Sequence, residues 1–131
     1  MPELVAILVC DQIIRDVQTN KSSLIGLFNR ITAENFPSIH PRIHVFVSLT
    51  NGHGTGDGEL RCVRRDVDET IGGMKGKIKF PSPLAVVDMN FNIAGIHFPG
   101  PGRYSFDFYF NGELLGSRPF EVMAEPNAET P

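Results

Sequence analysis

Tryptophan is absent from this 131-residue sequence, and tyrosine occurs only twice. Carbohydrate-binding surfaces usually present an aromatic platform to the sugar, so this shortage argues against a carbohydrate-binding protein. Cysteine is also scarce, and Cys10 and Cys62 lie far apart in a chain that shows no export signal. We therefore expect free, buried thiols rather than a disulfide.

Basic residues and long apolar runs are likewise few. The formal net charge is −3, so no overall positive field draws the chain to nucleic acid or to an anionic membrane. No apolar run approaches the roughly 18 residues of a membrane-spanning helix. Glu3 stands where a signal peptide carries basic residues, and Asp11 directly follows the apolar run from Leu4 to Cys10. These absences predict a cytoplasmic protein without membrane binding, and they argue against nucleic acid as a partner.

The residues of an active site are missing as well. The sequence has no Gly-x-Ser-x-Gly motif, and Gly72 to Lys77 lacks the spacing of a P-loop. Both cysteines lie in apolar strand patterns, where a thiol is inert. The histidines lack the close paired spacing of a zinc site, and they are His40, His44, His53 and His97. We therefore expect no enzyme activity, no cofactor and no metal ion.

The sequence is rich in alternation between apolar and polar residues. Tyr104, Phe106, Phe108 and Phe110 alternate with Ser105, Asp107 and Tyr109, which is the pattern of a strand with one buried face. Asn111-Gly112 follows this run and indicates a hairpin. A two-residue loop would turn Leu114 and Phe120 away from the aromatic face. Because side chains alternate between the two faces of a strand, a loop with an odd number of residues keeps Leu114 and Phe120 on the aromatic face. We therefore expect a three-residue loop with Gly112 in the left-handed conformation, beside a bulge.

Similar patterns predict about eight strands and no helix. The expected strands cover residues 4–16, 23–32, 42–50, 59–67, 74–80, 84–96, 104–110 and a last strand that ends at Val122. Residues 33–41, with Phe36-Pro37 and His40-Pro41, are expected to form a loop, and the glycine-rich residues 51–58 a mobile loop. By length, residues 1–123 form a single domain, and residues 124–131 are expected to be a disordered tail.

The spacing before the aromatic strand indicates the kind of fold. Ile93, Ile96, Gly102 and Tyr104 follow the pattern of the E–F corner in immunoglobulin-like sandwiches, where a tyrosine hydroxyl bonds back to the upstream backbone. The predicted fold class is therefore all-β, an immunoglobulin-like antiparallel β-sandwich. Another antiparallel sandwich with a corner of proline and glycine is the alternative.

Several short motifs resemble a known family. They are Cys10-Asp11, Asp16, Lys21-x-Ser23-Leu24-Ile25-Gly26-x-Phe28, Phe36-Pro37 and the hairpin from Gly112 to Gly116. Together they are similar to a family of short bacterial proteins of unknown function, and the resemblance covers most of the chain. It implies a stand-alone bacterial domain, and it implies no activity.

The first two expected strands are apolar on both faces. A sandwich strand normally shows one face to water, so something else is expected to cover the second face. A loop such as Ala33 to Pro41, which carries Phe36 and Ile39, is one candidate, and another subunit is the one that we favour. The candidate interface lies on residues 4–10 and 24–28 and comprises Leu4, Ala6, Leu8, Leu24 and Leu27. The predicted function is a non-catalytic protein-binding or self-assembly module, as a homo-oligomer or with another protein.

The alternative is a protein that binds a small ligand or a metal ion through residues 51–58 and the acidic turn 66–69. Its candidate residues are His53, Asp57, Asp66 and Asp68. A row of basic residues has no assigned role and comprises Arg61, Arg65, Lys75, Lys77 and Lys79. This row would form one stripe if the two strands that carry it were neighbours.

Overall fold

The computed structural model describes residues 1–125, which form nine β-strands and no helix, hence none that is long and apolar enough to cross a membrane. The strands are β1 (Glu3–Arg15), β2 (Ser22–Leu27), β3 (Arg30–Ala33), β4 (Ser38–Thr50), β5 (Gly54–Arg64), β6 (Glu69–Phe80), β7 (Val87–Phe98), β8 (Gly102–Phe110) and β9 (Glu113–Ala124). The predicted all-β class is confirmed. The predicted tail begins at residue 124, but Ala124 still belongs to β9, and residues 126–131 lie outside the described part.

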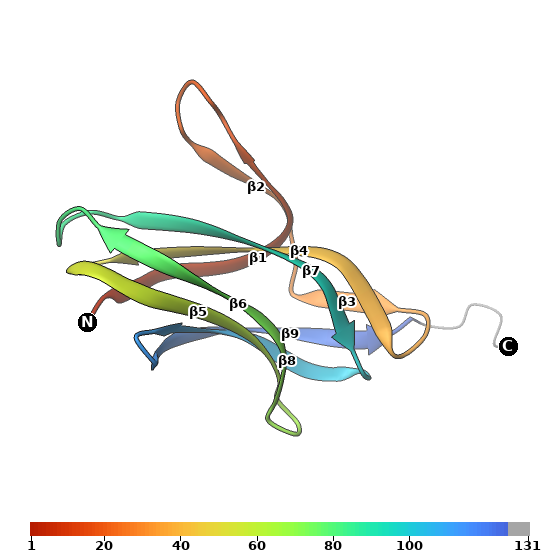
Figure 1. The fold of residues 1–131 in the computed structure, drawn as a ribbon. Helices are drawn as coiled ribbons and strands as arrows, with labels where there is room; N and C mark the ends of the chain where they lie inside the picture. Colours follow the sequence, from red (N-terminus) through yellow and green to blue (C-terminus); the bar gives the residue numbers. More distant parts are fainter. Residues whose placement is uncertain (126–131) are drawn as a thin grey trace, which may run out of the picture.

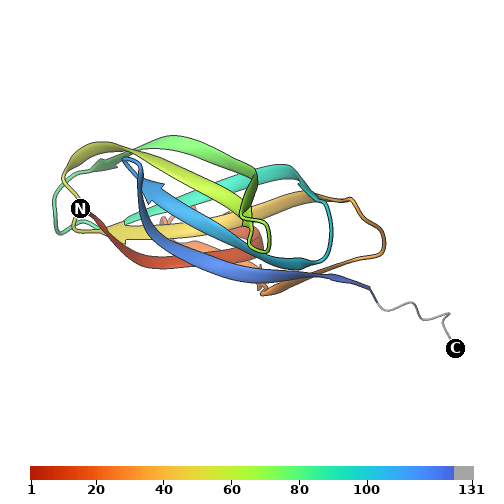
Figure 2. The same cartoon turned by 90° about the horizontal axis from the view of Figure 1, so that it is seen from below.

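The strands form two sheets that lie one above the other (Figure 1). The four-stranded sheet has the order β2-β1-β4-β7, and the five-stranded sheet has the order β3-β9-β8-β5-β6. Neighbouring strands are antiparallel except β3 and β9, which run parallel. Figure 2 views the molecule from the side of the five-stranded sheet.

The core lies between the two sheets and contains the alternating residues of both. Val45, Val47 and Leu49 of β4 are completely buried, as are Phe106 and Phe108 of β8. Aromatic rings pack edge-on or stacked across the core, where Phe120 contacts Phe98, Tyr104 and Phe106, and Phe98 also contacts Tyr104. The predicted aromatic face of residues 104–110 is therefore the centre of the core, where burial of large rings stabilises the fold.

The corner between β7 and β8 contains the predicted tyrosine bond. The Tyr104 hydroxyl is buried and donates to the carbonyl oxygen of Gly100 at 2.7 Å. Removal from water raises the pKa of this hydroxyl, which keeps it in the neutral form that can donate the bond. The bond therefore joins the start of β8 to the turn that precedes it.

The predicted strand 23–32 is two strands in different sheets. β2 pairs with β1, whereas β3 pairs in parallel with β9. Asn29, between them, is bonded to the five-stranded sheet through both its backbone and its side chain. Its carbonyl oxygen accepts the N–H of Glu121 at 3.0 Å, and its side-chain oxygen accepts a bond from Arg118 at 2.8 Å. These contacts hold the segment after β2 beside β9, so the chain passes from the four-stranded sheet to the five-stranded sheet between β2 and β3.

The predicted loop 33–41 is too long, because β4 begins at Ser38 and runs through Pro41. Proline lacks an N–H and is tolerated where a strand has no neighbour on that side. β1 pairs with β4 only as far as His44, so Pro41 lies beyond the reach of β1. On the other side, the register places it opposite Gly95, which has φ +66°.

The glycine-rich residues 51–58 do not form the predicted mobile loop, because β5 begins at Gly54. Gly56 and Gly58 are buried in this strand. A Cβ on Gly56 would collide with the ring of Phe110, and a Cβ on Gly58 would collide with Ile78. The glycines thus leave room for large core side chains of neighbouring strands. β6 and β7 also differ from the prediction, since they start at Glu69 and Val87.

The hairpin between β8 and β9 has a two-residue loop instead of the predicted three. Asn111 and Gly112 both have positive φ, at 48° and 84°, as a tight hairpin turn requires. The predicted bulge is present between Phe108 and Tyr109, and it returns Phe120 to the aromatic face. A bulge within the strands, rather than a third loop residue, therefore keeps Phe120 on the same face as the aromatic residues of β8.

Candidate functional site

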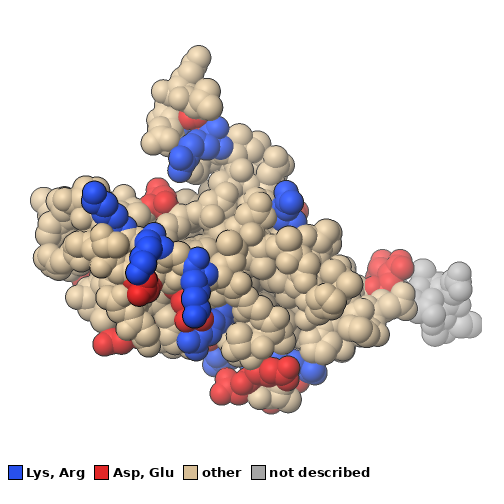
Figure 3. All heavy atoms as spheres, in the orientation of Figure 1, with Lys and Arg blue, Asp and Glu red and all other residues tan. Residues whose placement is uncertain are grey.

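A β-hairpin projects from the body of the molecule. β1 pairs with β4 only up to Cys10, and the rest of β1 pairs with β2 alone, from Gln12 opposite Ile25 to Arg15 opposite Ser22. We call residues 12–25 the arm. Figure 1 shows the arm rising away from the two sheets, and Figure 3 shows its tip clear of the body. Its outer part is therefore held by contacts within the hairpin.

The turn of the arm is stabilised by local hydrogen bonds. The carboxylate of Asp16 accepts the backbone N–H groups of Gln18 at 2.8 Å and Thr19 at 3.3 Å. The N–H of Asp16 donates to the carbonyl oxygen of Lys21 at 2.9 Å, and Asn20 has a positive φ of 59°. Asparagine and aspartate suit such turns because their side chains bond nearby backbone groups. The arm is therefore a defined hairpin.

Large apolar side chains of this hairpin are exposed to solvent. Val17 at the turn is 94% exposed, and the strand residues Ile14 and Ile25 are 44% and 46% exposed. Leu27, next to the arm, is 56% exposed. Contiguous apolar surface on a protruding element is typical of a protein contact site. The sequence interpretation had named Leu27 and had included Ile25 within its range 24–28, but it had missed Ile14 and Val17.

The predicted interface residues divide between two environments. Leu4 differs from the prediction, because it packs against the core and approaches Gly116 of the opposite sheet. Ala6 and Leu8 lie opposite Ser48 and Phe46 and are half-buried on the outer face of the four-stranded sheet. Leu24 is half-buried in the arm opposite Ile13, and Leu27 is exposed opposite Cys10. The β-bulge between Leu4 and Ala6 accounts for the split, since it reverses which side chains face the core.

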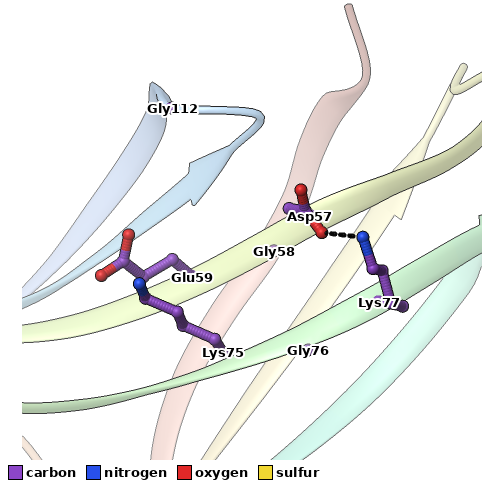
Figure 4. Close-up of a pocket in the computed structure, with 7 residues that line it drawn as sticks. All are labelled: Asp57, Gly58, Glu59, Lys75, Gly76, Lys77 and Gly112. Atoms are coloured by element: carbon purple, nitrogen blue, oxygen red, sulfur yellow. Dashed lines mark ion pairs between the residues drawn. The ribbon is translucent and has the colours of Figure 1, made fainter.

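The predicted basic row lies on neighbouring strands, β5 and β6, but acidic residues interrupt it. Lys77 forms an ion pair with Asp57, and Lys75 lies opposite Glu59 (Figure 4). A depression of about 420 Å³ is lined by these four residues together with Gly58, Gly76 and Gly112. Figure 3 likewise shows basic and acidic side chains next to one another over the body.

The arginines of the row are paired as well. Arg61 lies over the ring of Tyr109, 4.1 Å from its centre, and donates to Glu59 at 3.1 Å. This hydrogen bond lowers the pKa of Glu59. Arg65 lies 3.6 Å from the carboxylate of Asp107. Three of the five basic residues, Arg61, Arg65 and Lys77, are therefore paired with carboxylates, so the row is not a uniform basic surface and is less suited to binding a polyanion.

The predicted ligand residues do not come together. His53 precedes β5 and Asp57 lies within it, whereas Asp66 and Asp68 lie in the turn that follows β5. A strand of eleven residues spans about 35 Å, so the two groups lie toward opposite ends of the sheet. Asp66 is also engaged by Arg64 at 2.9 Å. Within residues 1–125, no group of three or more His, Cys, Asp or Glu side chains is placed to hold a metal ion.

A buried polar pair lies on the outer face of β8, where the sequence interpretation expected solvent-facing residues. The Ser105 hydroxyl donates to the Asp107 carboxylate at 2.8 Å, and both residues are buried. A groove of about 760 Å³ runs beside Ser105 and is lined in part by Arg65, Arg103 and Glu121. Alternation alone did not reveal the pair, because neighbouring side chains on the same face cover it.

Both cysteines are free and buried, as predicted. Burial raises the pKa of the Cys62 thiol to about 12, and the carboxylate of Asp107 adds to this effect. Burial likewise raises the pKa of Cys10. A reactive cysteine needs a lowered pKa and access to solvent, so neither thiol has the environment of a nucleophile.

Comparison with known proteins gives a family and no activity. The model of a family of unknown function, DUF6941, matches residues 5–123 of the 131-residue chain. No curated protein matches the chain. The match includes all of β2 through β8 and most of β1 and β9, so the arm and both sheets lie within the family pattern. The chain therefore belongs to this family of unknown function, DUF6941.

Proposed function

We propose that this domain is a non-catalytic protein-binding and self-assembly module. Its contact surface is the arm together with the adjoining outer face of the four-stranded sheet, where Ala6, Leu8 and Phe46 lie. The observation that carries the proposal is the exposure of Ile14, Val17 and Ile25 on a hairpin that projects from the body.

The physical argument concerns the stability of the arm. A two-stranded hairpin alone is only marginally stable in water. The arm nevertheless leaves nearly all of Val17 and almost half of Ile14 and Ile25 exposed to solvent, and this exposed surface contributes nothing to stability. Contact with another chain would remove this apolar surface from water and stabilise the hairpin, at roughly 25 cal/mol for each Å² buried.

The ligand-binding alternative has less support. Its residues lie toward opposite ends of β5, and Asp57 and Asp66 are each paired with a basic side chain. Assembly through the arm needs no such convergence of side chains, since apolar contact is not directional.

The proposal includes an immunoglobulin-like topology. The order β9-β8-β5-β6 corresponds to strands G, F, C and C′ of a variable-type domain, and β1-β4-β7 to strands A, B and E. The bond from Tyr104 to Gly100 supports the same assignment. An experimental structure with another strand order would contradict it. The bacterial origin and cytoplasmic location belong to the same proposal and depend on the sequence pattern alone.

The test is the solution mass over a range of concentrations, measured by light scattering after size exclusion. We expect the unaltered protein to form a dimer or larger species that dissociates on dilution. Changing Val17 and Ile25 together to serine should give a monomer, because the exposed apolar surface of the arm is lost.

A matched control lies outside the arm. Leu84 is 91% exposed, nearly as much as Val17, so Leu84→Ser removes a comparable exposed apolar side chain from another place. We expect this variant to assemble like the unaltered protein. An unaltered protein that stays monomeric at every concentration would contradict self-assembly, and equal effects of the two changes would contradict the assignment to the arm.

A further inference from the structure

We infer that assembly occurs edge to edge, through β2 of one copy pairing antiparallel with β2 of a second copy. This inference depends on the proposed function and names both the partner and the mode of contact. Two copies related by a two-fold axis would join their four-stranded sheets into one continuous sheet across the arms.

The four sheet edges of residues 1–125 differ in how they are protected. β6 carries Lys75, Lys77 and Lys79. β7 carries Asp88, and β3 has four residues with Arg30 among them. β2, by contrast, has six residues, Ser22–Leu27, with neither a charge nor a proline, and its one glycine with positive φ, Gly26, lies near its end. Because charged or short edges prevent unwanted pairing, β2 is the edge most open to another strand.

The backbone of β2 has groups free to bond a second strand. The N–H of Asp16 bonds the carbonyl oxygen of Lys21 at the end of the hairpin. In an antiparallel ladder the residues alternate between pairs that bond each other and pairs that do not. Counting from Lys21, the backbone groups of Ser22 and Leu24 therefore point away from β1, toward the open edge.

The side chains favour a second copy of the same strand as the partner. Antiparallel pairing of β2 with itself places only uncharged residues opposite one another, whereas pairing of β6 with itself would bring lysines together. The exposed Ile25 of each copy would lie beside that of the other across the joined sheet. Identical strands also close around a two-fold axis, so assembly stops at the dimer.

Cysteine cross-linking tests the pairing directly. Near a two-fold axis a residue lies close to its own counterpart, so one of Ser23→Cys, Leu24→Cys and Ile25→Cys should give a covalent dimer under mild oxidation. The native thiols are buried and should not interfere. The control is Lys77→Cys on the opposite edge strand β6, which should remain monomeric on a non-reducing gel.

A proline substitution provides an independent measurement. Ser22→Pro removes an N–H that points to the open edge, at the first residue of β2, where the hairpin itself tolerates proline. We expect a dimer dissociation constant about tenfold higher, from lost edge hydrogen bonds, with an unchanged circular dichroism spectrum.

The outcomes separate this inference from the proposed function. If the unaltered protein is a dimer but no β2 cysteine cross-links and Ser22→Pro has no effect, edge pairing is wrong and another surface joins the copies. If the unaltered protein is a monomer at all concentrations, self-assembly itself is wrong. Cross-linking within β2 together with weaker association of Ser22→Pro would support the inference.

Discussion

At the scale of single residues, the glycines of β5 show how a missing side chain shapes the core. Gly56 lies against the ring of Phe110, which itself packs edge-on with Phe80 at 5.8 Å. A Cβ at this position would have to displace a buried aromatic ring. The preference for glycine here is therefore a matter of packing, and its backbone conformation is ordinary for a strand.

We expect Gly56→Ala to lower the free energy of unfolding by about 1–3 kcal/mol, the usual effect of overpacking a core. Gly76→Ala is the matched control, because no atom lies within 4 Å of its Cβ position and it also lies in a strand. This control should be neutral or slightly stabilising. Urea denaturation followed by circular dichroism measures both, and equal effects would mean that the Phe110 ring moves aside freely.

At the scale of strands, β1 has two parts with different surroundings. Its first part, up to Cys10, pairs with β4 and contributes Ile7 and Val9 to the core, while its last residues pair only with β2. β8 is different, since β5 and β9 flank it along most of its length. Local opening needs less free energy where fewer contacts must break.

We therefore expect amide hydrogens of the arm to exchange faster than those of β8. The measurement is hydrogen exchange followed by mass spectrometry or NMR, at a concentration where the protein is monomeric. Exchange of both segments at the same rate would show that the arm opens only when the whole domain unfolds. At higher concentration, slower exchange at Ser22 and Leu24 is the result that edge pairing requires.

At the scale of the whole molecule, we expect stability to depend on pH through His40, which precedes the part of β4 that pairs with β1. His40 of β4 lies beside Phe28, with 6.4 Å between the ring centres. Burial lowers the pKa of His40 below its ordinary value of 6.5, although the carboxylate of Asp11 opposes this change. Folded His40 therefore binds a proton less readily than the same residue in the unfolded chain.

The sign of the pH effect follows from this difference. Above pH 6.5 both states are neutral at His40, so its contribution to stability is fully present, and it is lost as the pH falls through the folded pKa. We expect the unaltered protein to lose more stability between pH 7.5 and 5.5 than His40→Gln does. His53→Gln, at an exposed position, should behave like the unaltered protein. Equal losses in all three proteins would contradict this role of His40.

Predictions from local sequence patterns were correct where residues adjacent in the chain determine the structure. The alternation from Tyr104 to Phe110 correctly identified a core strand, because side chains along a strand point to opposite faces whatever its partner. The tyrosine corner and the free thiols were also predicted. The predicted length of the loop after Phe110 was wrong, because the bulge between Phe108 and Tyr109 changes the alternation of side chains in the same way as a third loop residue would.

The sequence by itself thus determined the all-β class, most of the strand positions and the apolar character of the first two strands, since these depend on local periodicity. The tertiary structure decided which sheet each strand joins. It placed β3 beside β9 through contacts of Asn29 with residues about ninety positions away, and it left residues 12–25 as a projecting arm. It also placed the glycine-rich segment that begins at Gly54 in a strand, where the absence of side chains on Gly56 and Gly58 leaves room for Phe110 and Ile78. Such contacts join residues far apart in the chain, and no local pattern contains them.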